Sequence, residues 1–386
     1  MTAPRASNAA SSCSTCCRAT SVDVRCMSST RPAIIRTASI PRTSTRFCCA
    51  LRLRWIASPA ADSGASCDTG RFAAEHYLFE ISMSTIDNFQ LAASHRRHER
   101  MSYEKSVELR QVGTRYFESA APTDGACVVF IHGGIAFADT LGMSANLWER
   151  NIGAIAPNVA TYSYDVPDHS HPAIETLDDV VAHARAFIEH IGIRDVHLIG
   201  HGDGGIVALK LALAGVDAVR SVTLVGSNAA PLGDAVADFT IAAPPTPLAS
   251  RHAQRWLAER LSHSEHHLEV GRYLDEAVEA ATRRDAASSA QRKPRMRASI
   301  ARARAEIFAS CREGGLSVPV MLVWGFQDPL VSPRHALALF EILSARMEPV
   351  QLRFINRAGS MPFRERPDEF NAAVAGFIGA LRCTDR

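Results

Sequence analysis

This sequence has no long apolar run, few lysines and little net charge. No apolar run reaches the roughly 18 residues that a membrane-spanning helix needs, so we expect no transmembrane segment. The formal net charge is only +2, which indicates neither nucleic acid nor an anionic membrane as a partner. The few lysines, which we attribute to coding bias, are Lys105, Lys210 and Lys293. The apolar fraction of 47% in 386 residues is ample for a globular core.

Cysteine is scarce in the part of the chain that we expect to fold. The sequence has ten cysteines, but only Cys127, Cys311 and Cys383 lie beyond the first hundred residues. The run from Cys13 to Cys17 has no histidine nearby and no second pair at ligand spacing, which argues against a metal site. We therefore expect no metal and no cofactor, and a reduced, cytoplasmic protein.

Residues 1–100 differ in composition from the rest of the chain. They are rich in Ser, Thr, Arg and Ala and show no sustained helix or strand period. An Arg- and Ser-rich, acid-poor stretch is typical of an organelle transit peptide. The alternative, which we favour, is an over-extended start, with the natural protein beginning at Met83 or Met101. Under either hypothesis this leader is expected to be disordered and to carry no chemistry.

The most informative stretch is a strand, a glycine-rich turn and a helix. The apolar strand Val196–Ile199 leads into Gly200-His201-Gly202-Asp203-Gly204, and an apolar helix follows. Small residues there allow a sharp turn and a close approach of the helix to the strand. This is the context of the nucleophile elbow, G-x-S-x-G, in which the middle residue attacks the substrate. The middle residue is Gly202, which has no side chain.

A second turn is expected to complete an oxyanion hole beside this elbow. The strand Cys127–Ile131 ends in His132-Gly133-Gly134, ahead of the elbow. In such enzymes one donor comes from this turn and the other is the N–H after the nucleophile position, here Asp203. We therefore predict that Gly133, Gly134 and Asp203 bind a substrate carbonyl.

Three polar side chains near the two turns are further candidates for catalysis. His132 and His201 flank the oxyanion region and are candidate acids or bases, although we favour a packed, hydrogen-bonded role. Asp203 is a candidate nucleophile, but the glycine spacing puts Gly202 at the apex. A carboxylate at the start of the helix also suits the positive end of the helix dipole.

The strands expected at 107–112 and 114–117 predict a hairpin with its turn at Gly113. Beyond it, strands alternate with amphipathic helices, which include helices predicted at 147–156 and 177–191. This alternation predicts an α/β protein with a mainly parallel, eight-strand-type sheet flanked by helices. The alternation stops after position 228, where three prolines precede helical stretches at 249–261, 267–282 and 296–310. We predict a leader at 1–100, a core in two parts at 101–228 and 318–386, and a helical cap inserted at 229–317.

The predicted cap carries two charged clusters. A basic run between Arg292 and Arg304 would suit a clamp for an anionic substrate, but a solvated helix face is favoured. His263, His266 and His267 would suit an acid–base or metal cluster. With no Asp or Cys at ligand spacing, a surface patch is favoured for them.

Taken together, residues Met101–Leu381 resemble the α/β-hydrolase superfamily, and in particular the capped meta-cleavage-product (C–C bond) and ester hydrolases. The resemblance rests on the two turns above and on three further motifs: Asp165-Val166-Pro167, the W-G-x-x-D turn ending in Asp328, and Ala358-Gly359-Ser360.

The resemblance implies that Asp328 is the triad acid and that Ser360 occupies the position of the triad histidine. Two of the three triad positions, Gly202 and Ser360, are then replaced. Losing the serine or the histidine of such a triad costs about a million-fold in turnover. An oxyanion hole with substrate binding still gives roughly 10³- to 10⁴-fold over water.

Two functions from different classes follow from this pattern. The first is an enzyme that acts on a small carbonyl-containing metabolite by cofactor-free, non-serine chemistry, such as cyclisation, a lyase reaction or C–C cleavage. The second is a catalytically dead hydrolase scaffold that binds a small molecule or a partner. Either way we expect a small-molecule ligand and neither nucleic acid nor membrane. The oxyanion-hole motifs favour the enzyme.

We predict that a shortened chain beginning at Met101 folds as well as the full chain, because no core-forming pattern precedes that residue. Thermal unfolding and solubility of both chains check this. A shortened chain that is insoluble, or that melts at a much lower temperature, would show that the leader is structural.

Overall fold

The computed structural model describes residues 102–119, 125–136, 140–155, 159–229, 244–286 and 291–384. All of them belong to the compact unit Asp87–Arg386. The leader predicted at 1–100 lies outside the described residues, so that prediction and the predicted domain boundaries stay predictions.

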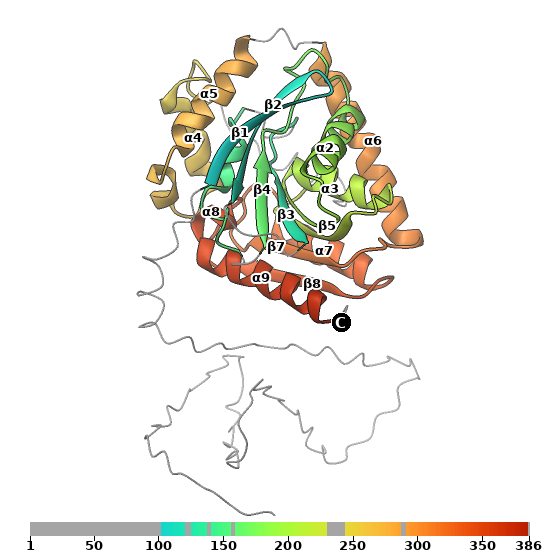
Figure 1. Ribbon diagram of the computed structural model, residues 1–386. Coiled ribbons are helices and arrows are strands. Elements are labelled where there is room, and N and C mark those ends of the chain that lie inside the picture. The colour runs from blue at the N-terminus through green and yellow to red at the C-terminus, as the bar shows by residue number, and fades with distance from the viewer. Residues whose placement is uncertain are drawn as a thin grey trace, which may run out of the picture. The chain divides into compact units, whose positions relative to one another are not determined.

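The described residues form an eight-stranded sheet in the order β1-β2-β4-β3-β5-β6-β7-β8 (Figure 1). β1 pairs with β2 and β2 with β4 in antiparallel fashion, and the other neighbours are parallel. The mainly parallel sheet predicted from the sequence is therefore confirmed. The strands are β1 (Ser102–Leu109), β2 (Val112–Ser119), β3 (Ala126–Ile131), β4 (Ala160–Tyr164), β5 (Asp195–His201), β6 (Val219–Val225), β7 (Val320–Gly325) and β8 (Val350–Ile355).

Two apolar cores cover the two faces of the sheet. Alternate residues of β3 point to opposite faces, as the period of a strand requires, so Val129 joins one core and Val128 the other. The first core is closed by α2 (Leu177–Ile191), α3 (Asp203–Leu213), α6 (Arg292–Glu313) and α7 (Pro333–Ser344). The second contains residues of η1 (Ala145–Trp148), α4 (Arg251–Leu261), η2 (Glu265–Glu269), α5 (Tyr273–Ala286), α8 (Pro362–Glu365) and α9 (Pro367–Thr384).

The first hairpin turns earlier than its glycine suggests. The sequence predicts the turn at Gly113, whereas Leu109 pairs with Val112 and the turn is Arg110-Gln111. Both turn residues have positive φ, 50° and 65°. This register buries Leu109 and Val112, so burial of the apolar face outweighs the preference of glycine for turns.

The helices of the predicted cap lie in two different places. α6 packs on α2, α3 and α7, beside the sheet, and Figure 1 draws it next to α2 and α3, away from α4 and α5. Its buried side chains recur at helical spacing, and this stripe joins the first core: Met296, Ile300, Ala303, Ile307 and Cys311. The segment outside the sheet-flanking layer is therefore α4–α5, residues 251–286.

The helix predicted at 147–156 is shorter in the structure, where η1 is a single 3₁₀ turn followed by further turns. Across the described ranges, no helix is both long enough and apolar enough to cross a membrane.

Ile300→Ala tests the placement of α6 in the sheet-flanking layer. Ile300 is fully buried, so the cavity is expected to cost about 2–5 kcal/mol of the free energy of unfolding. The matched control is Arg302→Ala, whose side chain is 61% exposed and is expected to cost well under about 1 kcal/mol. Urea unfolding should show the loss in the main transition. A loss confined to a separate minor transition would show that α6 is an independent cap element.

Candidate functional site

The glycine-rich turn between β5 and α3 has the backbone of an elbow. Gly202 lies at its apex with φ 52° and ψ −123°, a backbone conformation that residues other than glycine rarely adopt. Its N–H donates to the carbonyl of Val225 at 3.1 Å, and its carbonyl accepts from the Ser227 hydroxyl at 2.7 Å. Among the described residues, a Cβ on Gly202 would have only the Cα of Gly133 within 4 Å, at 3.8 Å. The space above the apex is therefore open to a side chain or to part of a ligand.

The turn after β3 lies directly against this elbow. A Cβ placed on Gly133 would lie 2.9 Å from the carbonyl oxygen of His201 and 3.4 Å from the nitrogen of Asp203. Gly134 has φ 79° and Met143 packs against it. The structure therefore brings together Gly133, Gly134 and Asp203, the residues predicted to hold a carbonyl oxygen.

The carboxylate of Asp203 is held by the surrounding structure. It is buried, and one oxygen accepts from the N–H of Ala136 at 3.0 Å and the other from the amide of Asn228 at 3.2 Å. A carboxylate held by two donors at the start of α3 is suited to fixing the turn, because attack would require it to leave both donors.

Both candidate histidines are buried. The Nε2 of His132 accepts from the N–H of Val166 at 2.9 Å, so its Nδ1–H donates to the carbonyl of Gly133. The Nε2–H of His201 donates to the carbonyl of Ser360 at 2.9 Å, and its ring lies edge-on to Trp148. Burial lowers the pKa of each to about 4, so both are neutral near pH 7. Their contacts fit the packed role favoured from the sequence.

Asp328 and Ser360 meet at the carboxyl ends of β7 and β8. The Ser360 hydroxyl donates to Oδ1 of Asp328 at 2.5 Å, and both residues are buried. The same Oδ1 accepts from the N–H groups of Leu330 and Val331 at 2.8 and 3.1 Å. Burial raises the pKa of Asp328 to about 6, while these three hydrogen bonds oppose the rise. The side chain at the position predicted for the triad histidine thus contacts the predicted acid directly.

Glu365, which the sequence reasoning missed, fixes the backbone next to Ser360. Its carboxylate accepts from the N–H groups of Gly359, His263 and Ser264 at 2.7 to 2.9 Å. The N–H of Ser360 donates to the carbonyl of Leu261 at 2.8 Å. Burial raises the pKa of Glu365 to about 7. The end of α4 therefore positions Ser360, and no local sequence pattern indicates this pairing.

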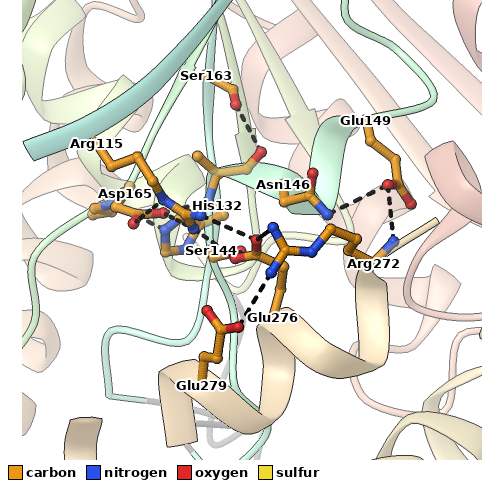
Figure 2. A network of polar contacts seen from close by, with 12 residues as sticks. Arg115, His132, Ser144, Asn146, Glu149, Ser163, Asp165, Arg272, Glu276 and Glu279 are labelled. Atoms are coloured by element: carbon orange, nitrogen blue, oxygen red, sulfur yellow. Dashed lines mark hydrogen bonds and ion pairs between the residues drawn. The ribbon is translucent and has the colours of Figure 1, made fainter. Parts of the chain in front are cut away.

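The start of α5 is attached through a partly buried set of ion pairs. Figure 2 shows Arg115 of β2 between Asp165 and Glu276. Glu276 of α5 is buried and also accepts from the Ser144 hydroxyl at 3.2 Å. Asp165, which lies in a motif singled out in the sequence, also accepts from the N–H of Ala145 at 2.7 Å. The motif therefore ties β2, η1 and α5 together.

Residues of both charged clusters in the predicted cap contact other parts of the structure. Arg292 donates to the carbonyls of His169 and Ser170, and Arg295 pairs with Glu175, so part of the basic run binds the loop before α2. The prediction of a histidine surface patch is wrong for His267. It is buried and bonds the Ser262 hydroxyl, because η2 turns its ring inward against Tyr273. Within the described part of the chain, no group of three or more His, Cys, Asp or Glu side chains is arranged to hold a metal ion.

A sequence model of the Alpha/beta hydrolase family matches residues 128–373. The match includes both turns, Asp328 and Ser360. The chain belongs to the α/β hydrolase family.

The similar curated proteins differ in how much of their length this chain covers. The chain is 31% identical over 126 residues to the dihydrolipoyllysine-residue acetyltransferase component of the acetoin cleaving system of Pseudomonas putida, covering 32% of this chain and 31% of that protein. It thus spans about a third of that relative's length. It is 24% identical over 261 residues to 3-oxoadipate enol-lactonase 2 of Acinetobacter baylyi, covering 62% of this chain and 86% of that protein.

Solved structures share the fold. A serine hydrolase from Cycloclasticus zankles superposes with a TM-score of 0.56 at 16% identity, covering 73% of this chain and 99% of that chain. The meta-cleavage product hydrolase CumD from Pseudomonas fluorescens IP01 gives a TM-score of 0.51 at 21% identity, covering 72% and 97%. At these identities the likeness establishes the α/β-hydrolase fold, as the sequence motifs predicted.

The raised pKa of Asp328 predicts a pH-dependent stability difference. The folded chain keeps a proton on Asp328 up to about pH 6, whereas an unfolded chain releases it near pH 4, so this contribution to stability is lost as the pH rises between them. The Asp328→Asn side chain does not titrate, so the variant does not lose this stability as the pH rises. From about pH 4.5 to about pH 7.5 the variant should gain roughly 2 kcal/mol relative to the wild type in urea unfolding.

Ser360→Ala is the matched comparison for this measurement. Without the Ser360 hydroxyl the charged form of Asp328 loses a donor, so the pH dependence should steepen instead of flattening. Equal pH dependence in the wild type and Asp328→Asn would contradict the assigned pKa.

Proposed function

We propose that this member of the α/β hydrolase family is an enzyme that acts on a small carbonyl compound without forming a covalent acyl-enzyme. The observation that carries the proposal is the contact between Gly133 and the Gly202-Asp203 turn. The contact keeps the two halves of an oxyanion-binding site side by side, although the apex has no nucleophile. Such a site stabilises charge that develops on a carbonyl oxygen and needs no cofactor to do so.

Three features support a non-serine reaction at this site. Gly202 offers no oxygen for acylation, and Ser360 bonds the acid at the position where the family has its histidine. Asp203 is held by Ala136 and Asn228. Of the described candidate residues, Asp328 keeps a carboxylate oxygen without a hydrogen-bond partner. The names of two similar proteins refer to enol-lactones and to meta-cleavage products, which are small carbonyl compounds of the kind that we propose.

The alternative, a scaffold that only binds its ligand, shares the oxyanion-binding site and differs in turnover. Both hypotheses therefore predict that the wild type binds a small oxyanion. A convenient probe is 4-nitrophenolate, whose absorbance changes when a hydrogen-bonding site takes it up. Absence of binding by the wild type would contradict both hypotheses.

Restoring the missing triad side chains tests whether the space above Gly202 belongs to the ligand. We expect Gly202→Ser with Ser360→His to abolish 4-nitrophenolate binding without creating a burst of 4-nitrophenyl acetate hydrolysis. The introduced hydroxymethyl group would fill the apex. The backbone of residue 360 is held by Leu261 and His201 in a buried position, so the larger imidazole would have to displace its neighbours.

Gly202→Ala is the control, since it fills the same space without supplying a hydroxyl. It should lose binding to the same degree. A double variant that shows burst-phase hydrolysis and keeps its affinity for 4-nitrophenolate would falsify the proposal and indicate a recently disarmed hydrolase.

A further inference from the structure

The carboxylate of Asp328 presents two different oxygens. Oδ1 accepts three hydrogen bonds, from the hydroxyl of Ser360 and the N–H groups of Leu330 and Val331. Oδ2 is buried and has no hydrogen-bond partner among the described residues. An unpartnered carboxylate oxygen in a buried site is costly, so its retention calls for a ligand or a function.

Oδ2 is directed toward the strand that separates Asp328 from the elbow. Gly226 follows β6, and a Cβ on it would lie 3.1 Å from Oδ2. β6 lies between β5, which ends at the elbow, and β7, which precedes Asp328. The carbonyl of Val225, one residue before Gly226, accepts the N–H of Gly202. Oδ2 therefore lies above the end of β6, on the side of Asp328 that faces Gly202.

The strand spacing expected between Oδ2 and the elbow suits a small carbonyl compound. Neighbouring strands lie about 4.8 Å apart, so Oδ2 above β6 is roughly one strand spacing from the elbow at the end of β5. A carbonyl oxygen bound between Gly133 and Asp203 would place the next carbon of the substrate toward β6. The open space above Gly202 receives that carbon, where an ordinary hydrolase would have its nucleophile.

We propose that Oδ2 of Asp328 is the base that removes a proton from the carbon next to the bound carbonyl, so that the substrate is a small enolisable ketone or ester. This inference rests on the proposed function, because it uses the oxyanion-binding site of Gly133, Gly134 and Asp203. It assigns to the acid of the family triad a direct role on the substrate.

The proton transfer balances without a cofactor. Oδ2 takes the proton, the electrons of the broken C–H bond form a C=C bond, and the carbonyl π electrons move to the oxygen. The resulting enolate oxygen is held by the N–H groups of the two turns. Return of a proton from Oδ2 to carbon regenerates the carbonyl compound, either at the same carbon or at a conjugated one. A base next to an oxyanion-binding site suffices for such enolisation.

The surroundings of Asp328 suit a base that works near neutral pH. The three donors to Oδ1 keep the carboxylate oriented, while burial raises its pKa to about 6. A base whose pKa lies close to the working pH is both deprotonated and strong enough to take a proton from carbon. The Ser360 hydroxyl therefore acts as a positioning group for Oδ1 and leaves Oδ2 available.

Hydrogen–deuterium exchange measures this step without knowledge of the natural substrate. The full chain is incubated in D₂O near neutral pH with 2-indanone or 2-tetralone, and deuterium uptake next to the carbonyl is followed by mass spectrometry. The wild type should accelerate exchange above the buffer rate, and 4-nitrophenolate should inhibit it. Asp328→Asn should lower the enzymatic rate by roughly 10²- to 10⁴-fold. Arg302→Ala, on the exposed face of α6, should exchange like the wild type.

Binding of 4-nitrophenolate separates a lost base from a damaged fold. Asp328→Asn should bind this anion at least as tightly as the wild type, because the substitution removes a nearby negative charge, whereas a collapsed site would bind it less tightly. If the wild type binds 4-nitrophenolate but exchanges neither ketone, or if Asp328→Asn exchanges as fast as the wild type, the base assignment is wrong and the proposed function stands. If the wild type does not bind 4-nitrophenolate, both are wrong.

Discussion

The site depends on how closely the α3 helix approaches the ends of β3 and β5. A Cβ on Gly204 would lie 2.3 Å from the carbonyl oxygen of Ile131, and one on Gly200 would lie 2.5 Å from that of Gly204. No side chain fits at such distances, so the two glycines fix the crossing of helix and strand. The crossing in turn sets Gly202 in its left-handed conformation and brings Gly133 against Asp203. The backbone geometry of an elbow is therefore independent of any side chain at its apex.

This independence explains why the fold was accessible from the sequence. The glycines of the elbow, the H-G-G turn and the W-G-x-x-D turn act through the backbone near their own positions, so short motifs predict them. The apolar period of α2 predicts its bounds, Leu177–Ile191, for the same reason. The prediction was wrong where distant burial decides, as at the Arg110-Gln111 turn. The apolar period of α6 is also visible in the sequence, but only the folded structure shows which of the two cores this helix joins.

The supports of the site were not accessible from the sequence, because they pair residues from distant segments. Glu365 bonds the backbone at Gly359 and at the end of α4, and Arg115 bonds Asp165 and Glu276. Arg364 is fully buried, donates to the carbonyl of Leu147 and pairs with Glu149. Each charge is stabilised only by the fold that buries it, and a single sequence carries no periodic signal for such pairs. Through them the end of α4 and the start of α5 are attached to the elements that surround the site.

The pairing of Asp328 with Ser360 changes what an acid in this position can do. A histidine at position 360 would donate a hydrogen bond to the carboxylate, and the proton transfer would then take place on its imidazole ring. A serine hydroxyl is too short to bridge to the elbow, and it saturates only Oδ1. Among the described residues the other oxygen of this buried carboxylate has no hydrogen-bond partner, burial raises its basicity, and the apex residue Gly202 carries no side chain. Under the two proposals above, a glycine at position 202 and a serine at position 360 do more than remove a triad, because together they leave a base next to an oxyanion-binding site.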